Sequence, residues 1–344
     1  MIDSKRKKIY YIIEPIKWVI SLEGKYISRN INALYNQQVE IIKTSKLRIS
    51  RINNQIIHFG SRNTFLPYNH NYVNKNNSII MTWYHGTDED VEYIKLLPEA
   101  SKELSFIHTS CTITREQLIK WGAEGEKIKI IPIGVDISLF DSMKKYNKRD
   151  IRKKMGIPDN AICIGSFQKD GDGWGEGNSP KLIKGPDIFC NVVERLNEEY
   201  PIFVLLTGPA RGYVKGRLDK AGIPFKHFYL KNYLNIVKFY KALDLYIISS
   251  RAEGGPKAIL ESFASGVPLV STNVGMVYDI AQNGYNAMVS EIDDIESLVD
   301  GCRKVIEDDD LRSRLISEGF KTVKDFDWKI IAGKYYKEIY SELL

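Results

Sequence analysis

Short apolar runs recur along almost the whole chain, separated by polar or glycine-containing segments. The runs are four or five residues long and rich in Ile, Val, Leu and Tyr. This length and composition are typical of buried β-strands. The runs predict strands at Ile9–Ile13, Val39–Ile42, Gln55–His58, Ile79–Trp83, Ser105–Thr109, Ile128–Pro132, Ala161–Gly165, Ile202–Leu206, Leu245–Ser249 and Pro268–Ser271.

Segments with apolar residues at helical spacing lie between these runs. They predict helices at Tyr26–Asn36, Thr114–Trp121, Pro186–Glu198, Val214–Ala221, Ile236–Ala242 and Lys257–Ser265, and a last helix within Asp327–Leu344. Strands that alternate with helices predict parallel sheets covered by helices on both faces.

A polar, charge-rich stretch at Asp141–Lys154 separates two successive sets of strands and helices. At 344 residues, the chain also has the length of two ordinary domains. We therefore predict an α/β protein with two doubly wound, Rossmann-like domains at residues 1–148 and 149–326, followed by a helix at 327–344. The two domains would face a cleft, which is the natural ligand site of such a pair.

The composition is that of a soluble globular protein, with 43% hydrophobic and 27% charged residues. No apolar run approaches the ~20 residues that a membrane-spanning helix needs; the best candidate, Ile9–Ile20, contains Glu14 and Lys17. The N-terminus lacks the apolar core and cleavage site of a secretory signal. The cysteines lie too far apart for a zinc or redox motif, which predicts buried thiols and a cytoplasmic location. They are Cys111, Cys163, Cys190 and Cys302.

Positive charge gathers in the first part of the chain. Residues 1–150 hold 23 Lys and Arg against 16 Asp and Glu, a net charge of +7, and the excess is densest at Lys5–Lys8. Such a patch can meet a membrane surface or an anionic substrate, or can simply be a solvated face. A nucleic-acid partner is not expected, because no helix-turn-helix, zinc-finger or RNA-recognition signature is present.

The stretch Glu253–Glu261 carries more chemistry than any other part of the sequence. It reads Glu-Gly-Gly-Pro-Lys-Ala-Ile-Leu-Glu, between an apolar strand and a helical segment. The Gly-Gly turn lets the backbone approach a ligand closely, and the proline suits the first position of a helix. The first amides of that helix would face an anion such as a phosphate. With a carboxylate on either side, the stretch suits a nucleotide sugar, whose diphosphate lies between two sets of hydroxyl groups.

A second unusual stretch, Lys169–Lys184, has glycines at 171, 173, 175 and 177 around Trp174. It fits neither a strand nor a helix, and it matches no P-loop or dinucleotide fingerprint. A loop this rich in glycine, between a strand and a helix, is either a ligand-contacting loop or a mobile segment. The sequence leaves both interpretations open.

Five stretches together resemble family 4 of the retaining glycosyltransferases, which have the two-domain GT-B fold. The stretch from Glu253 to Gly275 resembles the family's EX7E motif and the strand that follows it. The other four stretches follow the family's order and spacing. They are His85–Gly86, Ile131–Asp136 (IPIGVD), Lys184–Asp187 (KGPD) and Leu205–Pro209 (LLTGP).

The resemblance implies that the N-terminal domain binds the acceptor, the C-terminal domain binds the donor, and the last helix returns to the N-terminal domain. It implies front-face attack, in which the donor's own phosphate takes the acceptor's proton. Catalytic roles would fall on Glu253, which holds the transferred sugar, on Lys184, which stabilises the leaving diphosphate, and on His85. The donor-binding residues would be Gly254, Gly255, Pro256, Lys257, Ala258, Glu261, Lys169 and Gly208, with Glu261 on the ribose.

Each of these side chains also has a simpler structural interpretation. Glu253 is favourably placed before a helix N-terminus. Glu261 can pair with Lys257 at i,i+4, worth only ~0.2–0.5 kcal/mol. Lys184 could be a solvated lysine, although the helix dipole disfavours a cation there. His85 could be a structural histidine at a strand end.

The chain departs from the family pattern in three places. Ser166 stands where the family has an arginine, and Lys169 or Lys181 could replace its phosphate contact. Pro256 has no N–H to offer a phosphate. The glycine-rich loop that normally follows the first strand is reduced to Gly24-Lys25.

Asp88-Glu-Asp90 spells a DxD pattern, which holds a divalent metal in another glycosyltransferase architecture. Acidic residues are expected at a helix start in any case, and Asp170–Asp172 and Asp308–Asp310 give no stronger signal. We expect no metal and no cofactor besides the donor.

We therefore expect a cytoplasmic, retaining, metal-independent glycosyltransferase of polysaccharide or glycoconjugate synthesis. Its acceptor would be a glycan, a lipid-linked molecule or another hydroxyl compound, bound through residues 15–80. A lipid-linked acceptor would place it at the inner face of a membrane, with peripheral contact through the basic N-terminal domain. Base contacts are expected near His227–Lys231. The alternatives are a nucleotide-sugar epimerase on the same fold and a non-catalytic sugar-nucleotide binding protein.

Overall fold

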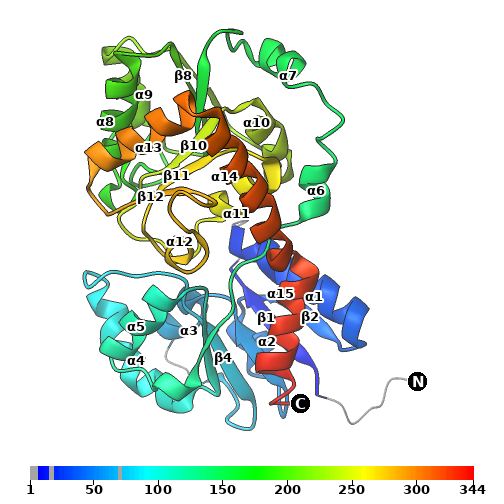
Figure 1. The fold of residues 1–344 in the computed structure, drawn as a ribbon. Helices are drawn as coiled ribbons and strands as arrows, with labels where there is room; N and C mark the ends of the chain where they lie inside the picture. The colour runs from blue at the N-terminus through cyan, green and yellow to red at the C-terminus, as the bar shows by residue number, and fades with distance from the viewer. Residues whose placement is uncertain (1–6, 15–18, 69–71) are drawn as a thin grey trace. The chain divides into compact units, whose positions relative to one another are not determined.

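The computed structural model describes residues 7–14, 19–68 and 72–344. The chain divides into two compact units (Figure 1). Unit 1 consists of Met1–Gly134 and Asp325–Leu344, and unit 2 consists of Val135–Lys324. Unit 1 is therefore built from two stretches that lie far apart in the sequence.

A parallel sheet of six strands, in the order β2-β1-β3-β4-β5-β6, forms the centre of unit 1. The strands are β1 (Ile9–Ile13), β2 (Val39–Lys43), β3 (Ile56–Phe59), β4 (Ser78–Thr82), β5 (Phe106–Thr109) and β6 (Ile128–Ile130). The helices are α1 (Val19–Tyr35), α2 (Lys46–Ile49), α3 (Arg62–Phe65), α4 (Val91–Glu103), α5 (Thr112–Lys120) and α15 (Trp328–Tyr335). Shorter helical turns are η1 (Leu66–Tyr68), η3 (Gly125–Lys127), η6 (Val323–Phe326), where the chain re-enters the unit, and the π-helical η7 (Tyr336–Tyr340).

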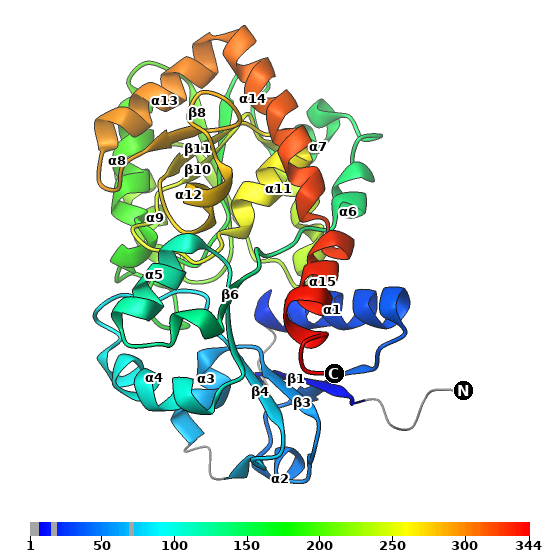
Figure 2. The same cartoon turned by 60° about the horizontal axis from the view of Figure 1, so that its bottom comes forward.

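Hydrophobic clusters cover both faces of this sheet. Strand β4 shows the alternation that a strand requires: Ile79 and Met81 belong to one cluster, and Ile80 belongs to the other. Helix α15 adds Trp328 and Ile331 to the second cluster and packs against α1 (Figure 2). The predicted return of the last helix to the N-terminal domain is confirmed.

Unit 2 contains a second parallel sheet of six strands, in the order β12-β11-β10-β7-β8-β9. The strands are β7 (Ile162–Ser166), β8 (Ile202–Thr207), β9 (Phe225–Phe228), β10 (Leu245–Ile248), β11 (Leu269–Thr272) and β12 (Met288–Ser290). The helices are α6 (Ile137–Asp141), α7 (Lys148–Met155), α8 (Pro186–Asn197), α9 (Gly212–Lys220), α10 (Ile236–Ala242), α11 (Lys257–Ser265), α12 (Met276–Ile280), α13 (Ile295–Glu307) and α14 (Asp309–Thr322). Short turns η4 (Leu182–Lys184) and η5 (Tyr233–Asn235) complete the unit.

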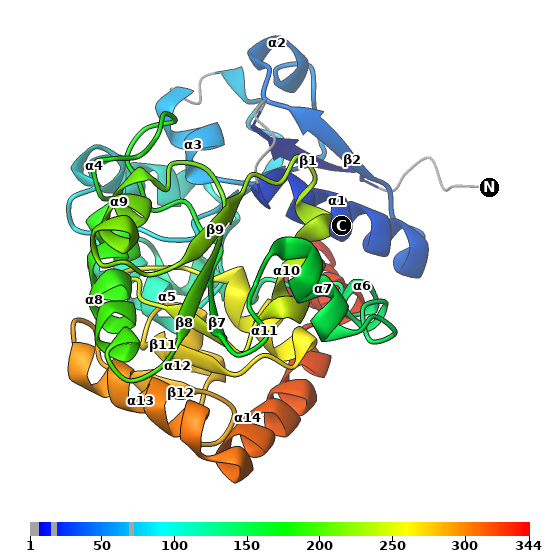
Figure 3. The same ribbon diagram turned by 90° about the horizontal axis from the view of Figure 1, so that it is seen from above.

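Helices cover both faces of this sheet as well. Helix α8 packs against α9 and α13, and α10 packs against α7 and α11. Figure 3 shows these two groups on opposite sides of β7 and β8. The predicted α/β class with two doubly wound domains is confirmed.

The ten predicted strands are all present, and each end lies within two residues of the predicted one. The prediction missed β9 and β12. Both are at an edge of the sheet in unit 2, and neither has a fully buried side-chain pattern.

The passage between the units lies at Gly134–Val135 rather than at residue 148. The charge-rich stretch that follows belongs to unit 2, because its charges are anchored there. Arg152 Nε donates to the carbonyl of Ala242 at 2.8 Å, and Lys148 Nζ lies 2.8 Å from the carboxylate of Asp244.

No helix within residues 7–14, 19–68 and 72–344 is long and apolar enough to cross a membrane. The four cysteines are buried and carry free thiols.

Candidate functional site

The strand order of unit 2 reverses between β7 and β10, which lie side by side. In open parallel sheets, ligands bind beyond the carboxyl ends of the strands at such a switch point. The chain leaving β7 forms the glycine-rich stretch and reaches Lys184. The chain leaving β10 forms the turn that holds Glu253. The predicted donor site therefore coincides with the point where this fold type places ligands.

Lys184 and Glu253 form an ion pair beyond these strand ends. Lys184 Nζ lies 2.6 Å from Glu253 Oε2, and the two side chains are only 17% and 11% exposed. Ser250 Oγ donates to the other carboxylate oxygen at 2.9 Å. Because an ammonium group has three donors, Lys184 can hold Glu253 and still donate to a ligand oxygen. The structure brings together the two residues of unit 2 that were predicted to be catalytic.

The backbone around Lys184 is fixed by a very close approach. Gly185 has φ +59°, and a Cβ there would lie 1.8 Å from the carbonyl oxygen of Ser249, so a larger residue is excluded. Arg251 clamps the same region with a bidentate ion pair to Asp187, at 2.7 and 2.9 Å. The backbone next to Lys184 is therefore held by contacts with residues that follow β10.

The Gly-Gly-Pro turn is locked to the segment that follows β11. The carbonyl of Gly254 accepts from the N–H of Met276 at 2.8 Å, and a Cβ on Gly275 would lie 2.3 Å from that same carbonyl oxygen. Helix α11 begins at Lys257, so Pro256 is its N-cap residue rather than the first helical residue, as had been predicted. The amides of Lys257 and Ala258 at the start of α11 have no i−4 acceptor within the helix and are suited to an anion.

Glu261 lies in α11 and is almost completely buried, with 6% of the residue exposed. Tyr233 Oη donates to its Oε1. Burial raises the pKa of the Glu261 carboxyl, and the hydrogen bond from Tyr233 and the nearby Lys257 amine oppose this rise. The predicted i,i+4 partner is therefore near, and the hydrogen bond from Tyr233 is a contact that the sequence did not indicate.

Two further predicted donor-binding residues, Lys169 and Gly208, follow the carboxyl ends of β7 and β8. Lys169 Nζ lies over the ring of Trp174, 4.7 Å from its centroid. Gly208 has φ +91°, and a Cβ there would lie 2.7 Å from the carbonyl oxygen of Gln168. The carbonyl of Gly208 is hydrogen-bonded to Nε2 of His227, the first residue of the stretch predicted to contact the base, at 2.7 Å.

A buried arginine that the sequence did not indicate connects the carboxyl ends of β7 and β8. Arg211 is 1% exposed. Its Nη1 donates to the carbonyls of Ser166, Gln168 and Thr207 at 2.8–2.9 Å, and its Nε lies 3.0 Å from Asp170. A single Arg at a predicted helix start normally suggests a solvated side chain, so no local signal could have identified it.

His85 belongs to unit 1 and is described with that unit. It is half-buried in the loop between β4 and α4. In the same loop Tyr84 donates to the buried Glu23, and Asp90 forms an ion pair with Arg62 at 2.9 Å. The loop is thus ordered by polar contacts on both sides of His85.

The DxD carboxylates have protein partners. Asp88 accepts from Trp121 Nε1 at 2.8 Å and from Lys120 at 2.9 Å, and Asp90 holds Arg62. In the part of the chain that the structure describes, no three His, Cys, Asp or Glu side chains gather as a metal site would require.

Several predictions for the amino-terminal region fall partly outside the described residues. Lys5 and Arg6 of the basic patch lie outside them, whereas Lys7 Nζ donates to the carbonyl of Leu343 at 2.8 Å. Residues 15–18 and 69–71 of the predicted acceptor stretch also lie outside. Gly24-Lys25 lies inside α1.

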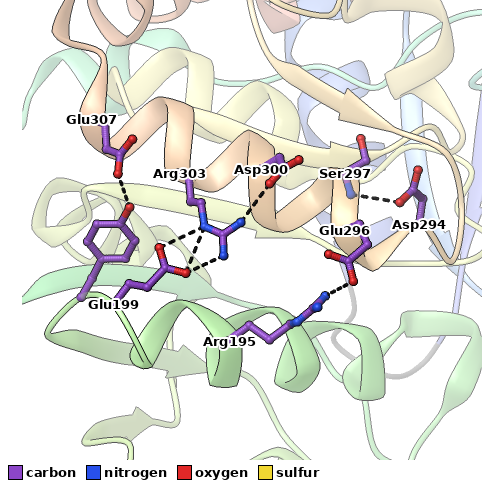
Figure 4. Close-up of polar contacts among 9 residues, drawn as sticks. Arg195, Glu199, Asp294, Glu296, Ser297, Asp300, Arg303 and Glu307 are labelled. Carbon is purple, nitrogen blue, oxygen red and sulfur yellow. Dashed lines mark hydrogen bonds and ion pairs between the residues drawn. The ribbon is translucent and has the colours of Figure 1, made fainter.

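A polar pocket of about 340 Å³ lies elsewhere on unit 2, beside β12 and α13. Its lining includes Asp294, which caps α13, and Glu296 and Asp300 within α13, and Figure 4 shows these acids together with the ion pair to Arg195 of α8. Arg195 pairs with Glu296 there, and Arg303 donates to Asp300 at 3.0 Å. The Arg195–Glu296 pair ties α8 to α13, whereas the Arg303–Asp300 contact lies within α13. None of the predicted site residues lines this pocket.

Comparison with known families gives a match within unit 2. Residues 180–322 match the family model described as Glycosyl transferases group 1. The matched stretch lies within unit 2. The matched stretch includes Lys184, Glu253 and Glu261. The predicted likeness to glycosyltransferases is confirmed at this level, while family 4 and its EX7E motif stay predictions.

The chain is also similar to curated glycosyltransferases. A lipopolysaccharide core biosynthesis mannosyltransferase of Rhizobium meliloti (strain 1021) is 26% identical over 52% of this chain and 50% of its own length. A UDP-Gal:alpha-D-GlcNAc-diphosphoundecaprenol alpha-1,3-galactosyltransferase of Escherichia coli is 26% identical over 58% of this chain and 52% of its own length. The chain thus spans about half the length of the curated relatives that it matches.

Solved structures resemble almost the whole chain. HepE of Anabaena, in complex with UDP and glucose, has a TM-score of 0.78 at 16% identity, over 98% of this chain and 100% of its own. A sucrose-phosphate synthase of Thermosynechococcus elongatus has a TM-score of 0.80 at 12% identity, over 98% and 100%. At these identities the likeness concerns the fold, and it confirms the predicted GT-B architecture.

Proposed function

We propose that this protein is a retaining, metal-independent glycosyltransferase of family 4. It transfers a sugar from a nucleoside-diphosphate donor to a hydroxyl group of a glycan, glycolipid or other acceptor. The observation that carries the proposal is the largely buried Lys184–Glu253 pair at the β7–β10 switch point, in the stretch that leads to the first turn of α11.

The chemistry of this reaction needs the charges found there. Departure of the nucleoside diphosphate builds negative charge on the β-phosphate, while the anomeric carbon becomes positive. The Lys184 amine and the first amides of α11 supply fixed positive charge for the leaving oxygen, and Glu253 accepts hydrogen bonds from the sugar hydroxyls. Groups held in place beforehand stabilise the transition state without having to reorganise during the reaction.

The remaining predicted residues take roles in donor binding or at the sugar. Glu261 chelates the ribose hydroxyls, with Lys169 and Gly208 beside the diphosphate and the base. His85 contacts the transferred sugar or the reacting hydroxyl. No protein side chain acts as a covalent nucleophile, because the donor phosphate takes the acceptor's proton.

Two features support a lipid-linked acceptor at the inner, cytoplasmic face of a membrane. Residues 1–150 carry a net charge of +7, and the galactosyltransferase of Escherichia coli acts, by its name, on a diphosphoundecaprenol. Anionic lipids attract a basic surface of this kind.

The test is a transfer assay with a panel of UDP, GDP and ADP sugars, run with and without EDTA. The variants are Glu253→Gln and Lys184→Ala, with Lys220→Gln on the exposed end of α9 as the matched control. We expect the site variants to lose about 10²–10³-fold in rate while the control keeps wild-type activity. Full activity of the Glu253→Gln variant would contradict the proposal. Loss of wild-type activity when EDTA is added would contradict its metal independence.

The same assay separates the alternatives. An epimerase would convert the sugar of the donor without any acceptor present. A non-catalytic binding protein would bind the donor, shown by a higher melting temperature, but would release no nucleoside diphosphate in any mixture.

A further inference from the structure

The glycine-rich stretch 169–184 forms a hairpin that follows β7. The N–H of Asp172 donates to the carbonyl of Ser179 at 2.9 Å, and the N–H of Lys181 donates to the carbonyl of Asp170 at 2.8 Å. These two bonds align the two arms of the hairpin, with Trp174 exposed near its tip. The stretch is therefore an ordered element, and the roles given above to the site residues do not account for it.

The hairpin is fixed to the body of unit 2. The buried pair between Asp170 and Arg211 lies at its base. Farther along, the N–H of Gly212 donates to the carbonyl of Glu176 at 2.7 Å. A Cβ on Gly177 would lie 2.3 Å from the carbonyl oxygen of Ala210, so the two backbones touch directly. These contacts fix the backbone of the hairpin, and therefore the positions from which its side chains extend.

Three lysines converge where the hairpin ends. Lys169 immediately precedes Asp170, whose carbonyl binds the N–H of Lys181, so the two lysines lie on adjacent arms. The N–H of Lys184 donates to the carbonyl of Lys181 at 2.8 Å, which places these two lysines one turn apart. Lys184 is paired with Glu253. Within the described part of the chain, the half-buried Lys181 amine makes no hydrogen bond or ion pair.

Electrostatics supports an anion among these amines. Partial burial lowers the pKa of Lys181, and the nearby amines of Lys184 and Lys169 lower it further, although Asp172 and Glu253 act in the opposite direction. A partly buried cation beside two others is unfavourable unless a negative group compensates it. A phosphate, with several acceptor oxygens, would satisfy all three amines at once.

We propose that Lys181, together with Lys169, binds the diphosphate of the donor from the hairpin side, opposite the first turn of α11. This inference rests on the proposed function, and it identifies which side chains of the donor site bind the negatively charged diphosphate. The hairpin supplies the cations that the family resemblance assigns to an arginine, at a position where this chain has Ser166. Arg211 cannot take that role, because its guanidinium is already occupied by Ser166, Gln168, Thr207 and Asp170.

The experiment is calorimetric titration of the full chain with inorganic pyrophosphate, UDP, GDP and ADP. The variants are Lys181→Gln and Lys169→Gln, with Lys220→Gln as the matched control. We expect Lys181→Gln to weaken pyrophosphate and the preferred nucleotide about tenfold or more, as the loss of a charge-assisted hydrogen bond implies. The charge-retaining Lys181→Arg should recover part of the affinity, and uridine, guanosine or adenosine should bind all variants equally.

The emission of Trp174 provides a second measurement, which does not depend on the Lys181→Gln variant. Because Lys169 lies over the Trp174 ring, movement of its amine to a phosphate should change the emission of Trp174 when pyrophosphate is added. Trp174→Phe identifies that part of the signal. Wild-type affinity in Lys181→Gln, or no Trp174 response in a protein that binds pyrophosphate, would overturn the inference.

Failure of the inference can be told apart from failure of the proposed function. A protein that transfers sugar but binds pyrophosphate independently of Lys181 refutes only the hairpin site. A protein that binds pyrophosphate through Lys181 but transfers no sugar from any donor retains the anion site and refutes the transferase.

Discussion

Close backbone approaches, rather than side-chain packing alone, fix the residues of the candidate site. Gly185 and Gly275 both have φ in the left-handed region, at +59° and +51°. Each lies against a backbone carbonyl oxygen that follows β10, that of Ser249 for Gly185 and that of Gly254 for Gly275. Glycine adopts such backbone conformations at little cost, whereas other residues are strained there. The geometry of Lys184 and Glu253 therefore depends on residues that carry no functional group.

Gly275→Ala should impair both stability and transfer. The new Cβ would lie 2.3 Å from the carbonyl oxygen of Gly254 and 2.6 Å from that of Glu253, so the turn must shift. We expect the free energy of unfolding to fall by about 1–3 kcal/mol, with a loss of turnover. Urea unfolding and the transfer assay measure the two effects.

Gly216→Ala is the matched control for this substitution. Gly216 lies inside α9, and a Cβ there would meet no atom within 4 Å. Alanine should stabilise the helix by about 0.5–1 kcal/mol and leave transfer unchanged. Equal behaviour of the two alanine variants would show that the contact at Gly275 does not matter.

Residues with a local signal could be predicted, and residues defined by distant contacts could not. Glu253 and Lys184 lie in short patterns that can be read along the chain, and the structure brings them together. Tyr233 and Arg211 reach their partners only through folding: Tyr233 contacts a carboxylate 28 positions away, and Arg211 contacts Ser166 at a separation of 45. Nothing in their own neighbourhoods indicated these contacts.

The same distinction holds for whole elements. Strands buried on both faces, such as β8 with six buried residues, have continuous apolar sequences and were predicted. Edge strand β9 has a mixed sequence, Phe-Lys-His-Phe, because part of it faces solvent. The glycine-rich hairpin could not be predicted, since its shape depends on the Asp170–Arg211 pair and on contacts with the start of α9.

Arg211→Met should destabilise unit 2 strongly. The substitution would leave Asp170, which is fully buried, without its cation. Breaking a buried ion pair by removing one partner typically costs about 3–5 kcal/mol. Chemical unfolding followed by circular dichroism measures the loss.

Arg149→Met provides the matched control. Arg149 is also paired with an aspartate, Asp159, but the two side chains are 77% and 56% exposed. Exposed pairs contribute about 0–1 kcal/mol, so this variant should unfold almost like the wild type. A loss of similar size in both variants would contradict the anchoring role of Arg211.

At the scale of the whole molecule, the last helix makes unit 1 depend on both ends of the chain. A buried polar network joins the sheet to the C-terminal residues: His58 contacts Tyr340 at 2.6 Å and Thr82 at 2.8 Å, and Thr82 contacts His108 at 3.0 Å. Tyr335 also reaches His108, at 2.9 Å. Two buried imidazoles therefore couple the sheet to the final residues of the chain.

This network predicts how stability depends on pH. Burial lowers the pKa of His108 to about 4 and that of His58 well below its usual value, so both rings are neutral in the folded protein. In the unfolded chain they titrate near 6.5. Below that pH the unfolded chain binds protons that the folded protein does not bind. The free energy of unfolding therefore falls as the pH drops from about 6.5 to about 4. Above pH 6.5 the pair has no effect.

The size of this effect can be measured with histidine variants. A shift from 6.5 to about 4 corresponds to roughly 3 kcal/mol for His108 alone, large against the 5–15 kcal/mol typical of a whole protein. We expect His108→Asn to be less stable than wild type at pH 7.5, yet to lose less stability on acidification. If His108→Asn instead shows the wild-type slope between pH 6.5 and 4, the acid sensitivity does not arise from the histidines that couple the sheet to the final residues of the chain.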